Sequence, residues 1–179
     1  DTKIKVDVKV AAEVASTGAW GDFSSSAKLE GNMKIEVTGS LGTKVIEIAS
    51  GSTASEVQAA INAVKVHTGV SASVQSDQLT LASAGYGSRE FVSVNVLEGG
   101  DLTGGGTITH HERVYGKDGT VLINGQSVTT DGLNVYYNSA GISFGFSMNA
   151  TALNKANGTG TVSFTIDHNR GGATFQLGT

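Results

Sequence analysis

GSTASEVQAAINAVKVHTGVSASVQSDQLTL, residues 51–81, is the stretch of this chain with the clearest structural pattern. Its first half predicts a short amphipathic helix over residues 53–66. The Thr53 hydroxyl can accept a hydrogen bond from a free N–H group of the first turn. Glu56, three residues later, can accept one from the Thr53 N–H group, which completes a capping box. Four apolar residues follow at the spacing of one helical face, namely Val57, Ala60, Ile61 and Val64.

The second half of the stretch predicts two strands after the helix. Gly69 is expected to end the helix, because glycine readily adopts the left-handed conformation that closes helices. Val70, Ala72 and Val74 then alternate with polar residues, which is typical of a half-buried strand. A second strand is expected over residues 78–82. The pattern therefore predicts a helix, a glycine stop and two strands, in that order.

The composition limits what this protein can be. Of its 179 residues, 39% are hydrophobic and only 16% are charged, and the net charge is -4. The lysines form no clustered basic face, so nucleic acid is not an expected partner. No run of residues approaches the length of a membrane-spanning segment, so no membrane partner is expected either. Cysteine is absent, which excludes disulfides, zinc–thiolate sites and a thiol nucleophile.

The rest of the chain predicts strands separated by glycine-rich turns. Residues 2–10 alternate strictly between polar and apolar types, which indicates a strand with one buried face. Residues 99–106 contain five glycines, a content that favours a boundary between two units. The predicted fold class is α+β and mainly β. Residues 1–99 are expected to form a β-rich unit with the helix packed on its sheet, and residues 107–179 an all-β meander or small barrel.

Two short patterns imitate catalytic or metal sites. Residues 141–145, GISFG, have the spacing of the nucleophile elbow of serine hydrolases, but that elbow needs a turn from a strand into a helix. Ser143 lies instead inside a strand-like alternation and is interpreted as an ordinary strand serine. A zinc-peptidase helix beginning at His111 would need a second histidine at the position of Tyr115. No catalytic residue, metal site or cofactor is therefore predicted.

The aromatic residues allow two interpretations. Trp20, Phe23, Tyr136 and Tyr137 are candidates for a carbohydrate-stacking surface, because their rings offer flat apolar faces. Aromatic residues make up only 6% of the chain, so packing in the core is the simpler interpretation. An extracellular β module that binds sugar or protein stays as an alternative, which exposure of these rings would favour.

Two segments resemble the variable middle region of bacterial flagellins. Ile61-Asn62-Ala63, followed by Thr68-Gly69-Val70-Ser71-Ala72, is similar to a repeat motif of that region, and the same repeat occurs in hook-associated proteins. Residues 171–179 resemble the point at which flagellins lead back into their helical filament core. The positions that carry the resemblance are Thr53, Glu56, Val57, Ile61, Asn62, Gly69, Val70, Ala72, Phe175, Gln176, Leu177 and Gly178.

The resemblance implies a structural protein that is not an enzyme. The chain would be an outer region of flagellin, without the terminal helical core, exposed on the extracellular filament and contributing to motility and surface antigenicity. Its implied partners are neighbouring flagellin subunits, contacted through the missing core, and O-linked glycans on exposed serine and threonine. The region by itself would be a monomer. The repeat fits the outer domain of a filament cap or hook-associated protein equally well, whereas Phe175-Gln176-Leu177-Gly178 favours filament flagellin.

Overall fold

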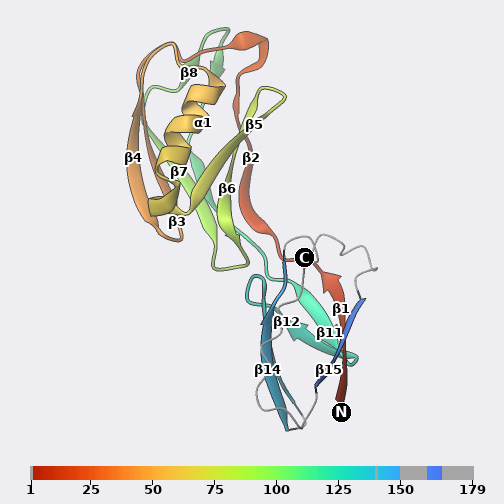
Figure 1. Cartoon of the computed structure of the whole chain (residues 1–179). Helices are drawn as coiled ribbons and strands as arrows, with labels where there is room; N and C mark the ends of the chain where they lie inside the picture. Colours follow the sequence, from red (N-terminus) through yellow and green to blue (C-terminus); the bar gives the residue numbers. More distant parts are fainter. Residues whose placement is uncertain (1, 140, 150–160, 167–179) are drawn as a thin grey trace. The chain divides into compact units, whose positions relative to one another are not determined.

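The chain divides into two compact units that alternate along the sequence (Figure 1). A computed structural model of the protein describes residues 2–139, 141–149 and 161–166. The terminal unit comprises Asp1–Glu13, Tyr86–Ser88 and Lys117–Thr179, and the inserted unit comprises Val14–Gly85 and Arg89–Gly116. The inserted unit thus interrupts the terminal unit in the sequence.

In the described residues of the terminal unit, all regular secondary structure is β-strand. These strands are β1 (Thr2–Val10), β11 (Thr120–Ile123), β12 (Gln126–Thr129), β13 (Asn134–Ser139), β14 (Ile142–Ser147) and β15 (Thr161–Ile166). Four of them form a sheet in the order β12-β11-β1-β15, and β13 pairs with β14 in a hairpin. The first strand is therefore central and antiparallel to both neighbours, with Val6 opposite Ile123 on one side and Val162 on the other.

The core of the terminal unit follows from the alternation along β1. Ile4, Val6 and Val8 are buried and Lys3 and Lys5 are exposed, as the sequence predicts, whereas Val10 at the end of the strand is exposed. The buried residues pack in one cluster with Ala12, Val121, Ile123, Val135, Phe146 and Met148.

The inserted unit contains two main sheets, a small hairpin and the helices. Its elements are β2 (Val14–Asp22), η1 (Ser24–Ser26), β3 (Met33–Gly39), β4 (Gly42–Ile48), α1 (Ala54–Ala63), α2 (Lys65–Thr68), β5 (Val70–Gln75), β6 (Gln78–Tyr86), β7 (Phe91–Glu98), β8 (Asp101–Leu102), β9 (Gly106–Thr107) and β10 (His111–Tyr115). One sheet has the order β10-β7-β3-β4 and the other the order β2-β6-β5, while β8 and β9 pair with each other.

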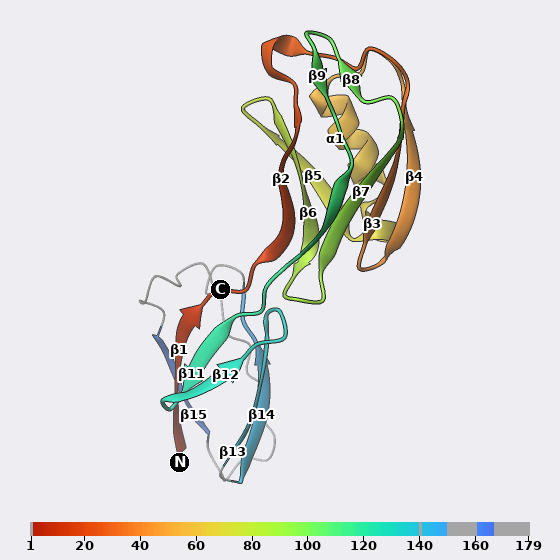
Figure 2. The same ribbon diagram turned by 180° about the vertical axis from the view of Figure 1, so that it is seen from behind.

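One hydrophobic core joins both main sheets of the inserted unit to the helix. Figure 1 shows α1 in front of the β10-β7-β3-β4 sheet, and Figure 2 shows the unit from behind. Val57 and Ile61 of α1 are completely buried. They share a cluster with side chains from both sheets, among them Ile35, Val70 and Leu81. A helix of this length is marginal by itself in water, so burial of its apolar face supplies most of its stability.

The fold class predicted from the sequence is confirmed, with one difference in the helix. The structure is mainly β, with one short helix packed against sheets. Residues 53–66 form two helical pieces rather than one, because Val64 between α1 and α2 has φ -103° and ψ 7°. Gly69 closes the second piece in the left-handed conformation, with φ 74°. The described strands form open sheets and do not close into a barrel.

The division into units differs from the boundary expected at residues 99–106. That segment lies inside the inserted unit, where β8 and β9 form a hairpin. Gly99 and Gly100 have positive φ, and a Cβ atom would lie 2.3 Å from the Asn32 carbonyl oxygen at Gly99 and 2.5 Å from the Ile108 carbonyl oxygen at Gly100. These glycines therefore permit close approach of backbone segments rather than a linker. Strand β1 also pairs with β11 and β15, which come from the second half of the chain.

We predict that residues 14–116 fold on their own, because they contain every residue of the inserted unit's core cluster. A fragment of these residues should unfold cooperatively in urea and give dispersed amide resonances. Residues 1–99 serve as the matched control and should not fold cooperatively, because β1 loses both neighbours and β7 loses β10. A cooperative 1–99 fragment together with an unfolded 14–116 fragment would contradict this division.

Candidate functional site

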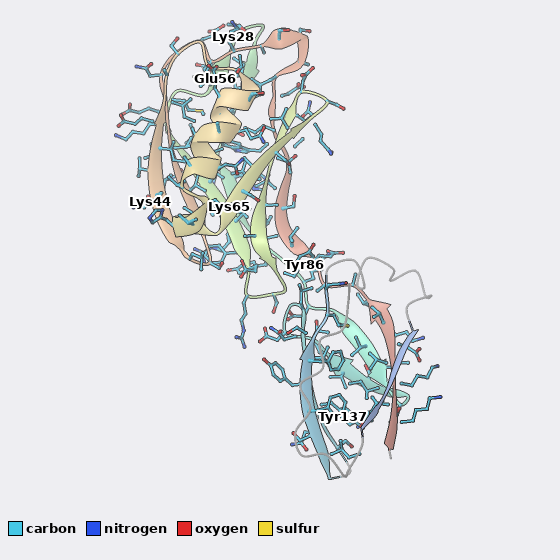
Figure 3. All side chains as sticks on the ribbon, in the orientation of Figure 1. Lys28, Lys44, Glu56, Lys65, Tyr86 and Tyr137 are labelled. Carbon is cyan, nitrogen blue, oxygen red and sulfur yellow. The ribbon has the colours of Figure 1, made fainter. Side chains whose placement is uncertain are left out.

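The helix of the inserted unit begins with a complete capping box. The Thr53 hydroxyl accepts a hydrogen bond from the Glu56 N–H group at 3.4 Å, and a Glu56 carboxylate oxygen accepts from the Thr53 N–H group at 2.8 Å. Two hydrogen bonds lower the pKa of Glu56 below its ordinary value of 4.5. The bond donated by the Thr53 backbone has the larger effect, and the bond donated by the Thr53 hydroxyl has the smaller one. Figure 3 shows Glu56 at the start of α1. The cap predicted from the sequence is confirmed.

Ile61 and Asn62 fix the helix to the next strand by different means. Ile61 is completely buried in the core of the inserted unit. The Asn62 side chain makes two hydrogen bonds to one residue of β5: its amide nitrogen donates to the Ala72 carbonyl at 3.0 Å, and its amide oxygen accepts from the Ala72 N–H group at 2.9 Å. An asparagine amide carries the same donor and acceptor as a peptide group. Asn62 therefore pairs with Ala72 as a neighbouring strand would.

The turn between α2 and β5 is held by hydrogen bonds of Thr68 and Gly69. The Thr68 hydroxyl donates to the Val64 carbonyl at 3.2 Å and accepts from the Val70 N–H group at 3.1 Å. The Gly69 N–H group donates to the Lys65 carbonyl at 2.8 Å, which closes the helix. Val70 is then completely buried and Ala72 is nearly so. These bonds fix where β5 starts and which of its side chains enter the core.

Two residues of this arrangement were not selected from the sequence. Thr68 was noted as part of the repeat, but the sequence does not show that its hydroxyl bridges α2 and β5. Gly39, at the end of β3, is the second of these residues. A Cβ atom there would lie 2.3 Å from the Thr68 carbonyl oxygen, so only glycine lets β3 pass this turn. The sequence does not predict this requirement for glycine, because Thr68 is distant from Gly39 along the chain.

The candidate chemical groups Ser143 and His111 lie on strands of different units. Ser143 is exposed on β14, opposite Asn138 of β13. His111 lies on β10 beside exposed Glu112 and Arg113, and its ring nitrogen contacts the Glu112 carbonyl at 2.9 Å. Within the described residues, no group of three or more His, Asp or Glu side chains could hold a metal ion.

The aromatic residues divide between core and surface. Trp20 and Phe23 are buried, and the Trp20 indole N–H donates to the Thr109 carbonyl at 2.9 Å. Tyr137, visible in Figure 3, packs on Phe144 with ring centroids 5.3 Å apart. Tyr136 is 68% exposed. The core interpretation is therefore confirmed for Trp20 and Phe23 and is wrong for Tyr136.

Comparison with known proteins identifies the motif. Residues 32–85 match the family model of the flagellin hook IN motif. These residues include all eight positions predicted between Thr53 and Ala72, so the recognised motif is confirmed. The four positions Phe175, Gln176, Leu177 and Gly178 lie outside the described residues. The chain therefore carries this flagellin hook motif within its inserted unit. No curated protein sequence matches the chain.

Several solved structures of flagellar cap proteins share the fold. The D2–D3 domains of the Serratia marcescens cap protein have a TM-score of 0.56 and 20% identity, covering 93% of this chain and 93% of that one. The Pseudomonas aeruginosa PAO1 cap protein has a TM-score of 0.59 and 17% identity, covering 93% of this chain and 80% of that one. The Bdellovibrio bacteriovorus cap protein has a TM-score of 0.50 and 21% identity, covering 74% of this chain and 78% of that one.

Among the described residues, no helix has the length and apolar content that a membrane crossing needs.

We predict that Asn62→Ala lowers the free energy of unfolding by about 2 kcal/mol. The change removes both bonds to Ala72 and leaves a partly buried N–H and C=O group without their partner. Gln58→Ala, one turn earlier on α1, is the matched control and should cost less than about 0.5 kcal/mol. Urea unfolding of residues 14–116 measures both. Equal effects of the two changes would show that the Asn62–Ala72 bonds do not hold the helix to the strand.

We further predict an acid-dependent loss of stability that depends on Glu56. Because its folded-state pKa is lowered, its contribution is complete above the unfolded value near 4.5 and is lost as pH falls through the folded value. Glu56→Gln keeps an acceptor for the Thr53 N–H group but does not titrate. The stability difference between wild type and this variant should therefore shrink on acidification. A difference that stays constant from pH 7 to below the pKa of Glu56 would contradict the assignment; an NMR titration of the carboxyl group measures that pKa directly.

Proposed function

We propose that this chain is the outer, β-rich region of a flagellar filament cap protein. The observation that carries the proposal is the extent of the shared fold. The likeness to the Serratia marcescens cap domains covers 93% of each chain, and hence parts of both the terminal and the inserted unit. The repeat motif does not separate the classes, because residues 32–85 lie wholly within the inserted unit and flagellins and hook-associated proteins resemble it alike.

The outer region of filament flagellin is the second candidate. The observation that favours it is Phe175-Gln176-Leu177-Gly178, which resembles the return of flagellins into their filament core. That observation rests on four residues outside the described part of the chain. The fold likeness extends over most of the chain and therefore supports the cap more broadly.

In either case the proposed role is mechanical and not catalytic. The capping box, the Asn62–Ala72 bonds and the Thr68 bridge each end on backbone atoms and make one continuous frame in the inserted unit. The cap assignment places this frame outside the cell, on the flagellum, where it projects into solvent and contributes to motility and surface antigenicity. Stability without disulfides then rests on two separate hydrophobic cores.

The proposed partners follow from the same role. Neighbouring flagellar subunits would be contacted through a helical core outside residues 1–179, and this region by itself would be a monomer. Exposed hydroxyls, such as those of Ser24, Ser25 and Ser26 in η1, are proposed acceptors of O-linked glycans.

Immunogold electron microscopy of the source bacterium, with antibodies raised against residues 14–116, tests the assignment. We expect gold at the distal tip of the filament. A strain with the encoding gene deleted is the control and should carry none. Gold along the whole filament would transfer the assignment to flagellin, and gold at the hook junction would transfer it to a hook-associated protein. Gold on cell bodies alone would overturn the flagellar role.

A further inference from the structure

We propose that the outward face of the β13–β14 hairpin binds a neutral pyranose ring, stacked on Tyr136. The inference concerns a glycan-binding site and does not rest on the proposed flagellar role. It begins with the one large aromatic side chain that the terminal unit leaves on its described surface. Tyr136 is 68% exposed, whereas its neighbours Val135 and Tyr137 on β13 face the core.

The ring of Tyr136 is supported from below by the backbone of a glycine. Gly145 lies directly opposite Tyr136 in the antiparallel register. A Cβ atom on Gly145 would lie 3.1 Å from the Tyr136 Cδ1 atom and 3.4 Å from its Cε1 atom. The ring therefore lies across the position that a side chain would occupy. Glycine at this place lets the ring lie flat on the hairpin, and the exposed remainder of the ring faces solvent.

The residues around this ring are polar and uncharged. Side chains opposite each other on the same face of the hairpin are Asn134 with Ser147 and Asn138 with Ser143, one pair on each side of Tyr136. The Ser147 hydroxyl donates to the Asn134 amide oxygen at 2.5 Å. The Asn138 amide and the Ser143 hydroxyl are exposed. Neither β13 nor β14 contains a charged residue.

This combination fits the two surfaces of a sugar ring. A pyranose has an apolar face of C–H groups, which matches the flat face of tyrosine, and a rim of hydroxyls, which act as donors and acceptors. Asn138 offers both a donor and an acceptor, and Ser143 offers a hydroxyl, at one edge of the Tyr136 ring. Because the two strands carry no charge, they offer no ion pair to a phosphate or carboxylate, so the face favours a neutral ligand. A protein partner is less suited, because one large side chain between small ones does not form a buried hot spot.

Tyr115 is a second exposed tyrosine, and its surroundings differ from those of Tyr136. Tyr115 is also exposed, at 56%, but its ring packs beside Phe91 with centroids 5.9 Å apart. The Arg113 guanidinium lies 4.2 Å from the centroid of the Phe91 ring, and Glu112 is next to it in the sequence. An exposed tyrosine in a charged setting, without a glycine beneath it, is therefore the natural control.

The test is a titration of the ¹⁵N-labelled chain, followed by amide chemical shifts. The probes are methyl α-D-mannopyranoside, methyl β-D-galactopyranoside and N-acetyl-D-glucosamine, with N-acetylneuraminic acid as a charged probe. At least one neutral sugar should shift the amides of Tyr136, Asn138 and Gly145 with a common dissociation constant, in the roughly millimolar range of single-ring ligands. The charged sugar should bind about tenfold more weakly.

The variants separate stacking from a purely structural role of the tyrosine. Tyr136→Ala should weaken binding at least about tenfold, and Tyr136→Trp should keep the dissociation constant within about threefold. Tyr115→Ala should leave it unchanged. Asn138→Ala, an exposed change that does not disturb the ring, should also weaken binding. This variant provides the test if the hairpin of Tyr136→Ala fails to fold. Unchanged spectra with every neutral sugar, or shifts confined to other residues, would overturn the proposal. Amide shifts of Tyr136 that depend on protein concentration without sugar would instead make the face an interface between copies, and would overturn it too.

Discussion

The pairing of β1 is the constraint on which the rest of the structure depends. This strand comes from the start of the chain, yet it lies between β11 and β15, which come from its second half. Without it the terminal unit would lose the side chains of Ile4, Val6 and Val8 from its core. Glu13 and Lys117 exchange two backbone hydrogen bonds, of 2.8 and 3.0 Å, so the chain must leave and re-enter the terminal unit at one place. Everything between these residues except Tyr86–Ser88 therefore folds as an insertion with its own core.

Within that insertion, the short helix depends on bonds to the backbone at both of its ends. Ten residues are too few for a stable isolated helix. The capping box satisfies the N–H groups of Thr53 and Glu56 at its start. Asn62 bonds its end to β5, and Ile61 buries its inner face. Each of these residues has a task that only a few side chains can perform. That is a physical reason why this segment stays recognisable as a motif in a chain whose overall identity to proteins of the same fold is low.

Local rules of the sequence were sufficient for the elements, and insufficient for their long-range pairing. The capping box, the stop at Gly69 and the alternation along β1 each depend on residues a few positions apart, and all three are predictable from the sequence. The pairing of Val6 with Ile123 spans more than a hundred residues and leaves no local pattern, so the division into units was misplaced.

The role of a single glycine or tyrosine was equally hidden in the sequence. A glycine-rich segment looks the same whether it is a linker or a place where two backbone segments approach closely. For Gly99, only the position of Asn32 in the structure shows that it is a close approach. Asn62 and Ala72 were both identified by resemblance, but the two hydrogen bonds between them were not predicted. Composition likewise could not separate Tyr136 at the surface from Tyr137 in the core.

The way this fold is held together also explains how it is shared at identities of only 17–21%. Its specific bonds join side chains such as those of Asn62 and Thr68 to backbone atoms, which every residue type provides. The residue that receives such a bond is therefore restricted by size and burial and not by its own polar groups. Outward positions on the strands, among them Tyr136 and Asn138, make none of the framework contacts and are open to change. A frame of this kind lets an outer region alter the chemistry that it shows to its surroundings while the arrangement of its strands is kept.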